Sequence, residues 1–309
     1  MAESMRRALL WASTNPRLAS SLPRRRFVKR AVRKFMPGEE LDDALLASRT
    51  LAASGASVVL TMLGENLGTV GQTRDVVREY LAAMDRAEEL GLDLEVSVKP
   101  THLGLDQDRE LVLDNISELA ARTGDDRTVW IDMEGSVYKE PTLDLYRALG
   151  ATHDNVGVCL QSYLRQTPAD LERLLPLSPR IRLVKGAYAE PTELAFPDKS
   201  DVDAAYRRLA DTMFRHFRDG GGGMVALGTH DPELIGWLNA RIDEIGVDRD
   251  RYEFEMLYGI GLRQQQRLLE DGQPLRVLIS YGDAWFPWYM RRLAERPANV
   301  WFVARSLFR

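Results

Sequence analysis

From residue 55 onward, short apolar runs alternate with longer segments whose apolar residues recur at a helical period. Near-continuous apolar runs are typical of parallel strands that are buried on both faces. The runs predict strands at 57–63, 92–98, 128–133, 155–161, 181–187, 223–229, 252–258 and 274–280. Amphipathic segments predict helices at 72–90, 109–122, 202–218 and 233–245, and 38–55 predicts one more helix before the first strand.

This alternation predicts an α/β fold of the (β/α)8 TIM-barrel type. A doubly wound sheet is the alternative, but it usually has fewer strands and a glycine-rich turn after the first one. We assign residues 38–309 to the barrel as one catalytic domain, and residues 1–37 to a basic, helical N-terminal arm.

Side chains that can bind ligands or transfer protons gather where the predicted strands end. In a barrel the carboxyl ends of all strands lie on one rim, and barrel enzymes build their active sites there. We expect this rim to carry Glu65, Lys99, Asp132, Glu134, Gln161, Arg182, Lys185, Tyr188, Thr229 and His230. The pattern therefore indicates an enzyme.

Composition narrows the setting. The 309 residues include one cysteine, Cys159, so no internal disulfide can form, and a reducing cytoplasm is the natural environment. The four histidines show no paired spacing, which argues against a structural zinc site, and we expect no metal. No apolar run is long enough to span a bilayer.

Positive charge is concentrated at the N-terminus. Residues 1–36 carry ten lysines and arginines against one acid, a local charge of +9, which leaves about −14 for the rest of a chain whose total is −5. Apolar residues such as Leu9, Val32 and Phe35 favour an arm packed under the barrel. Contact with a membrane surface is the second interpretation, and a transit peptide stays open. Nucleic-acid binding is disfavoured, because the acidic body would repel a polyanion.

Three rim residues allow more than one role. Lys99 suits a Schiff-base nucleophile, a cation for an anionic substrate, or an ion-paired structural lysine. Asp132 suits a helix N-cap or a carboxylate directed into the barrel. His230 precedes a helix start at Asp231, which leaves it as a ligand contact or as a hydrogen-bonded polar residue.

The stretch RLVKGAY at 182–188 is the densest of these segments. Strand alternation puts Arg182 and Tyr188 on one face and Leu183 and Lys185 on the other. A buried arginine is costly unless an electron-rich group accepts its hydrogen bonds. A bound cofactor would be such a group.

Four motifs together resemble one family. RLVKGAY at 182–188, THD at 229–231, FEMLYG at 254–259 and YMRRLAE at 289–295 are similar to the bacterial monofunctional proline dehydrogenases, and the resemblance covers about residues 38–309. It implies an FAD-dependent enzyme that oxidises L-proline to 1-pyrroline-5-carboxylate and passes electrons to a membrane quinone. It also implies a distorted barrel whose last helix, 283–295, lies over the mouth, and a protein in the cytoplasm or on the inner face of the membrane.

The resemblance also implies roles for individual residues. Arg291, Arg292 and Lys99 would bind the substrate carboxylate, and Glu65 would pair with Arg291 as a gate when the mouth closes. Asp132 matches an active-site acid that orients Lys99. Arg182 matches the residue that hydrogen-bonds flavin N5. Further flavin contacts would come from Met133, Gln161, Lys185, Gly186, Ala187, Thr229 and His230, and the proline ring would lie against Tyr188, Leu183 and Leu257.

The sequence departs from the family at Leu278, where members commonly have a tyrosine against the substrate ring. Leucine keeps an apolar contact but removes a hydroxyl group. The choice between proline and 4-hydroxyproline is therefore open in this chain, and Tyr281 has the wrong strand parity to replace the missing tyrosine.

Other functions compete with this interpretation. A Schiff-base aldolase on the same barrel would use Lys99 or Lys185 as its nucleophile. A flavin barrel of the methylenetetrahydrofolate reductase type would oxidise NADH. A non-catalytic module that binds small anions would leave Arg182 buried without a partner.

The implied reaction predicts how activity depends on pH. A secondary amine gives up hydride readily only when it is neutral, so the rate of proline oxidation should rise toward alkaline pH. Initial rates measured between about pH 6 and about pH 9 test this expectation. A flat profile over that range contradicts it.

Overall fold

Eight parallel strands close into a barrel in the computed structural model, which describes residues 9, 11–13, 15, 32–124 and 126–295. The strands follow one another around the barrel in sequence order, and β1 closes it by pairing with β8. Their bounds are β1 Ser57–Met62, β2 Leu94–Val98, β3 Val129–Ile131, β4 Val156–Gln161, β5 Arg180–Val184, β6 Met224–Gly228, β7 Tyr252–Leu257 and β8 Leu275–Tyr281. The predicted fold class and the position of every predicted strand are confirmed.

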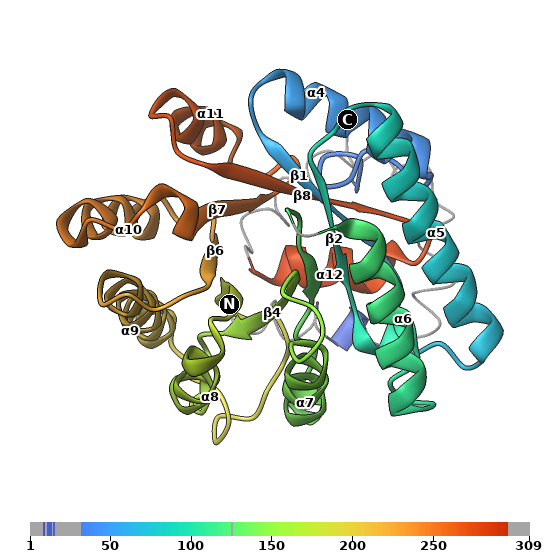
Figure 1. The fold of residues 1–309 in the computed structure, drawn as a ribbon, viewed down its shortest axis with the longest axis horizontal. Coiled ribbons are helices and arrows are strands. Elements are labelled where there is room, and N and C mark those ends of the chain that lie inside the picture. The colour runs from blue at the N-terminus through green and yellow to red at the C-terminus, as the bar shows by residue number, and fades with distance from the viewer. Residues whose placement is uncertain (1–8, 10, 14, 16–31, 125, 296–309) are drawn as a thin grey trace.

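Helices surround this barrel (Figure 1). Between the strands lie α5 Val70–Glu89, α6 Arg109–Thr123, α7 Lys139–Leu149, α8 Thr167–Leu174, α9 Lys199–Arg218, α10 Pro232–Ile245 and α11 Leu262–Glu270. Helix α4, Leu41–Ala53, precedes β1, and α12, Trp285–Glu295, follows β8. Short 3-10 turns cover Pro100–Leu103, Ser136–Tyr138, Leu175–Leu177 and Arg249–Arg251.

Side-chain alternation along the strands separates two environments. One face of each strand packs against the helices in a continuous apolar core, with residues such as Val58, Leu60 and Leu183 fully buried there. The other face fills the barrel interior, where Val59, Trp130 and Ala226 form a separate cluster. Because the side-chain period of a strand is two, one residue of register decides which environment a side chain enters.

The barrel interior also holds charged residues, two of which are in register with this apolar cluster, Glu95 beside Val59 and Glu253 beside Ala226. Arg276 of β8 contacts both carboxylate oxygens of Glu253, at 3.0 and 3.1 Å, and lies 3.3 Å from Glu95. Glu95 in turn accepts hydrogen bonds from the indole Nε1 of Trp130, at 2.6 Å, and from the backbone of Thr128, at 3.0 Å. The ion pairs and the indole therefore fix one another inside the barrel.

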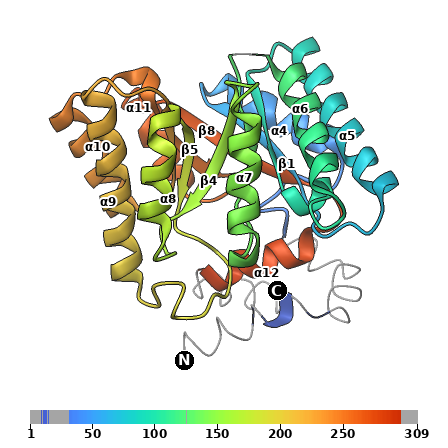
Figure 2. The ribbon, with the colours of Figure 1, turned by 60° about the horizontal axis from the view of Figure 1, so that its bottom comes forward.

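Helix α12 lies across one end of the barrel instead of beside β8 (Figures 1 and 2). Its apolar side chains form a cluster with Val32, Met36 and Leu63, the last of which follows β1. The indole Nε1 of Trp285 donates to the carboxylate of Glu39 at 2.9 Å. The expected position of the last helix is confirmed, and its aromatic sequence is explained by this packing.

Some residues of the predicted arm join the same cluster. Leu9, Ala12 and Phe35 are partly buried against it, and Val32 is fully buried, whereas Trp11 is 63% exposed. Most of residues 1–37 lie outside the described residues, so the division of the chain at residue 37 stays a prediction.

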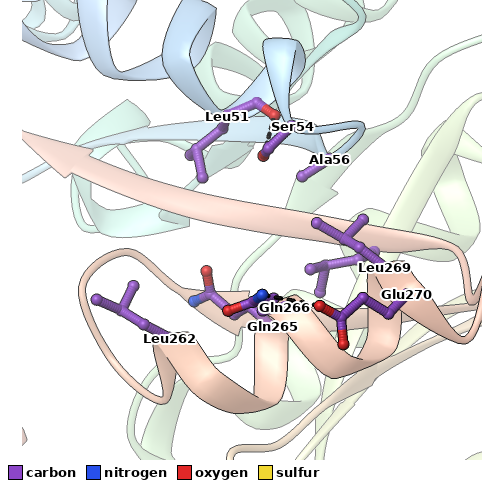
Figure 3. A pocket seen from close by; sticks show the side chains of 9 residues that line it. Leu51, Ser54, Ala56, Leu262, Gln265, Gln266, Leu269 and Glu270 are labelled. Carbon is purple, nitrogen blue, oxygen red and sulfur yellow. Dashed lines mark hydrogen bonds between the residues drawn. The ribbon is translucent and has the colours of Figure 1, made fainter.

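Helix α4 packs on β8 and β1, next to the place where an eighth outer helix would normally lie. A hollow of about 550 Å³ separates α4 from α11 (Figure 3). Leu51 and Ala56 approach it from α4 and the residues after it, and Leu262 and Leu269 approach it from α11. The displacement of α12 to the mouth thus leaves this side of β8 partly uncovered.

The barrel interior has no room for a further methyl group beside Trp130. A Cβ atom on Gly157 of β4 would lie 2.5 Å from the Trp130 ring, so Gly157→Ala should lower the free energy of unfolding by about 1–3 kcal/mol. Gly236 in α10 has no atom within 4 Å of such a Cβ, and Gly236→Ala should raise stability by up to about 1 kcal/mol. Urea denaturation of both variants measures the difference, and a Gly157→Ala variant as stable as the parent contradicts this packing.

Candidate active site

Arg182 is the central residue of a polar cluster in the barrel interior. It is 3% exposed, and its Nη1 donates to the Ser97 hydroxyl at 2.5 Å and to Asp132 Oδ1 at 3.0 Å. On its other edge, Nε and Nη2 contact the Glu255 carboxylate at 2.5 and 3.0 Å. Burial opposes the charge, but Glu255 and Asp132 outweigh it and raise the pKa of Arg182 above its usual value.

These contacts correct one expectation from the sequence. We expected an electron-rich group, such as a bound cofactor, to accept the hydrogen bonds of a buried Arg182, and an anion-binding module to leave it unpaired. In the structure the protein itself supplies two carboxylates and a hydroxyl group. Only the unpaired state was wrong, because β7, two strands along from β5, places the Glu255 carboxylate in contact with Arg182.

Asp132 follows β3 and points into the barrel mouth. Its Oδ1 accepts from Ser97 at 2.7 Å, and its Oδ2 lies 3.8 Å from the Lys99 ammonium. It does not cap a helix in the described structure, because Gly135 precedes the 3-10 turn that follows. Asp132 thus connects the two cations, Arg182 and Lys99.

Lys99 is 7% exposed and directly follows β2. Next to it, burial and the nearby Lys99 charge lower the pKa of His102 to about 4, so this imidazole is neutral at physiological pH. The basic side chain that faces Asp132 here is therefore Lys99 and not His102.

The α12 helix contributes Arg291 to the same mouth. Its guanidinium forms an ion pair with Glu65 and lies 5.2 Å from the centre of the Tyr188 ring. The side chains of Arg291 and Glu65 are only 11% and 23% exposed. Arg292 is half-buried on the same helix. The pair is the one expected from the sequence, while its role as a gate stays a prediction.

Lys185, Thr229 and His230 lie around the ends of β5 and β6. The Lys185 ammonium contacts Asp203 at 2.5 Å and Asp231 at 3.0 Å. Asp231 caps α10, as expected, by accepting from the backbone of Glu233. The His230 Nε2 accepts from the backbone N–H of Leu257 at 2.8 Å, and Thr229 is buried. Two carboxylates therefore hold Lys185, which makes it a poor candidate for a Schiff-base nucleophile.

The apolar residues expected around a substrate ring separate into two groups. Leu257 and Leu278 are neighbours in register on β7 and β8, and Leu278 packs on the interior cluster. Leu183 is 1% exposed in the core between strands and helices, on the opposite face of β5 from Arg182. We therefore leave Leu183 out of the substrate site. Tyr281 also packs in that outer core and does not replace the missing tyrosine at position 278.

Sequence reasoning missed two residues of the arrangement. Ser97 and Glu255 lie inside strands rather than at their ends, and attention to strand ends passed over them. The signal was present in YEFEML at 252–257, where charged residues alternate with apolar ones as they do on a strand with one polar face.

The residues around the mouth fit a flavin. Gln161 donates to the backbone oxygen of Met133 at 2.9 Å, but its buried Oε1 accepts no hydrogen bond from any residue that the structure describes. Buried acceptors are normally satisfied, so a bound group with an N–H donor suits this position. Gly186 has φ +111°, and a Cβ there would meet the Tyr163 ring at 2.2 Å, so only glycine lets the chain pass this close. Gly186 and Ala187 are half-buried at the rim.

Together, the fold and the mouth define a (β/α)8-barrel enzyme with several cations around one site. A protein-family model described as proline dehydrogenase matches residues 44–305. The chain is 34% identical to proline dehydrogenase 2 of Bacillus subtilis (strain 168) over 278 residues, 90% of each chain. It is also 34% identical to proline dehydrogenase of Deinococcus radiodurans over 312 residues, 98% of each chain.

A solved structure supports the fold. Proline utilization A from Bdellovibrio bacteriovorus, inactivated by N-propargylglycine, matches with a TM-score of 0.77 at 21% identity, over 87% of this chain and 33% of that one. The chain belongs to the proline dehydrogenase family, which implies a flavin cofactor. Membership supports this interpretation over the aldolase and reductase alternatives.

Glu134 provides a pH-dependent test of the site. It is 3% exposed and accepts from the backbone N–H and the hydroxyl of Thr101, at 3.0 and 2.7 Å. Burial raises its pKa to about 7, although the Thr101 bonds and Lys99 lower it. The folded protein thus holds a proton that the unfolded chain has released, so the stability contributed by Glu134 falls as pH rises from about 5 to about 7.

Replacing this carboxyl with an amide removes that dependence. The free energy of unfolding of Glu134→Gln, relative to the parent, should rise by on the order of 2 kcal/mol between about pH 5 and about pH 8. Denaturant unfolding at each pH measures it. Two parallel pH profiles contradict the placement of a protonated carboxyl at this position.

Proposed function

We propose that this chain oxidises L-proline to 1-pyrroline-5-carboxylate with FAD as its cofactor and passes the electrons to a quinone. The observation that carries the proposal is the convergence of Arg291, from the last helix, and Lys99, from β2, on one largely buried mouth. Family membership supplies the reaction class, and the cations supply the recognition of an amino-acid carboxylate.

Carboxylate binding is the task of the cations. Arg291 and Arg292 present planar donor groups that match a carboxylate, and Lys99 adds a compact positive charge. Charge-assisted hydrogen bonds of this kind contribute about 1.5–3 kcal/mol each when water is excluded. Tyr188, on which Arg291 lies, and the neighbouring Leu257 and Leu278 provide apolar surface for a pyrrolidine ring. The absence of a hydroxyl at Leu278 leaves no polar group there to distinguish 4-hydroxyproline.

Asp132 has a positioning role toward Lys99. Its Oδ1 is held by Ser97 and Arg182, so Oδ2 is left directed toward the ammonium 3.8 Å away. The carboxylate thereby limits the movement of Lys99. A fixed cation binds the substrate carboxylate with less loss of conformational entropy.

The flavin would be held by Arg182, Met133, Gln161, Lys185, Gly186, Ala187, Thr229 and His230. When bound, it would supply the redox chemistry by accepting two electrons from the substrate in the form of a hydride. Arg182 would donate a hydrogen bond to it and favour negative charge on its reduced form. Lys185 would act from the rim with its charge already shared by Asp203 and Asp231.

The Glu65–Arg291 pair would close the mouth around the substrate. Both side chains are mostly buried, so the pair shields the interior from water as it forms. Exclusion of water strengthens every charged contact inside the site. Opening would require this ion pair to break, which makes Glu65 and Arg291 the gate.

Electron transfer to a membrane quinone would require the protein to bind at a membrane surface. No helix among the described residues is long and apolar enough to cross a bilayer. The basic arm at 1–37, with a local charge of +9 over residues 1–36, would supply attraction to anionic lipid.

An absorption spectrum of the purified, FAD-loaded protein tests the proposal first. Flavin bands should be present, should bleach on anaerobic addition of L-proline, and should persist with NADH. If the flavin bands of the FAD-loaded protein do not change when L-proline is added, the proposal is contradicted. Bleaching by NADH would favour the reductase type.

The carboxylate clamp is tested by substitution. Arg291→Met removes one guanidinium from the site and should raise KM for L-proline about 10- to 100-fold, in line with the loss of one charge-assisted contact. Arg78→Met removes an exposed arginine from α5 and should leave KM unchanged. Equal kinetics for the two variants contradict a role for Arg291 in substrate binding.

A further inference from the structure

The Arg182 guanidinium is held on two edges and one face, all by residues of the barrel interior. Ser97 and Asp132 hold one edge, and Glu255 holds the other through two atoms. The Trp130 ring lies under the guanidinium, 4.6 Å from its central carbon. An arginine side chain is otherwise one of the most flexible. Its position here is therefore set by its partners.

Glu255 is the partner committed most fully to Arg182. It is 4% exposed and comes from β7, across the barrel from Asp132, which follows β3. Asp132 divides its oxygens between Ser97, Arg182 and Lys99, whereas both oxygens of the Glu255 carboxylate contact Arg182. A two-point contact fixes both the direction and the rotation of a guanidinium plane.

The carboxylates around Glu255 explain why it needs Arg182 as its counter-charge. Carboxylate oxygens of Glu95, Glu253 and Glu255 lie within 4.8 Å of one another, so like charges repel inside the barrel. Arg276 contacts Glu253 and Glu95, which leaves Arg182 to neutralise Glu255. Burial raises the pKa of Glu255, and the adjacent Arg182 opposes that rise.

We propose that Glu255 is a positioning residue for the reaction: its carboxylate sets the place and plane of the Arg182 guanidinium, and thereby the hydrogen bond that Arg182 gives to the cofactor. This inference rests on the proposed function, because it concerns how Arg182 meets a flavin. Glu255 itself need not touch substrate or cofactor.

The position of the carboxylate, and not only its charge, is the quantity to vary. Glu255→Asp keeps the negative charge but withdraws the carboxylate by one carbon–carbon bond. Glu253→Asp makes the same change two residues earlier on the same strand, where the carboxylate faces Arg276 instead of Arg182. The two variants are therefore matched in chemistry, strand and burial.

Anaerobic flavin reduction by L-proline in a stopped-flow instrument gives the first readout. Glu255→Asp should reduce its flavin about 10- to 100-fold more slowly than the parent, with the apparent Kd for proline within about threefold, because a displaced guanidinium disturbs orientation rather than substrate binding. Glu253→Asp should reduce its flavin at nearly the parental rate. Parental behaviour of Glu255→Asp, or equal slowing of both variants, overturns the inference.

A crystal structure of each variant without FAD gives a readout that does not depend on activity. The Arg182 guanidinium should move in Glu255→Asp and keep its place over Trp130 in Glu253→Asp. An unmoved guanidinium in Glu255→Asp overturns the inference. If Glu255→Asp does not fold, as judged by its thermal midpoint, Glu255→Gln against Glu253→Gln replaces the pair with the same expected order of rates and the same contrary result.

Measurements on the parent protein distinguish failure of the proposed function from failure of the inference about Glu255. If its FAD-loaded form is not bleached by proline, the proposed function fails, and the inference fails with it. If the parent is bleached and Glu255→Asp behaves like Glu253→Asp, the inference alone fails.

Discussion

The cost of placing charged side chains inside a barrel shapes much of this structure. Arg182 and Arg276 are both buried in the interior, and each can remain there only with carboxylates within contact distance. Glu255 meets the first and Glu253 meets the second, so the two pairs lie one above the other along β7. Trp130 lies between them, with its nitrogen bonded to Glu95 and its ring face under Arg182. Because every one of these groups needs its partner, the interior tolerates little change, and the rim receives an arginine in a defined orientation.

The second determinant is the position of α12. A helix beside β8 would bury its aromatic residues against the barrel wall, but α12 lies across one end of the barrel (Figure 2). Its aromatic residues pack there with Val32, Met36 and Leu63. This packing brings Arg291 to Glu65 and Tyr188, two residues that follow different strands. The site is therefore closed by α12, the last helix among the described residues. The hollow between α4 and α11 is the corresponding vacancy on the outer wall (Figure 3).

Individual residues show where sequence reasoning succeeds. The pair of Glu65 and Arg291 was expected from the family resemblance, and the helix cap at Asp231 was expected from the local helix-start pattern. Leu183 and Ser97 are two residues whose positions could not be predicted from the sequence. Leu183 belongs to a recognised motif, yet its side chain points to the outer core, because strand parity and not motif membership decides its direction. Ser97 lies within a buried strand with nothing in its neighbourhood to mark it, and it becomes visible only when β5 brings Arg182 to 2.5 Å.

The sequence by itself determined the number and order of strands, the barrel class, the rim residues and the family, because these depend on local periodicity and on short motifs within contiguous segments. The tertiary structure alone decided which charges from distant segments pair with one another. Arg182 and Glu255 are 73 residues apart, and Arg291 and Glu65 are 226 apart. Barrel closure, strand register and the position of α12 determine these pairs. None of the three can be predicted from the residue pattern of a single segment.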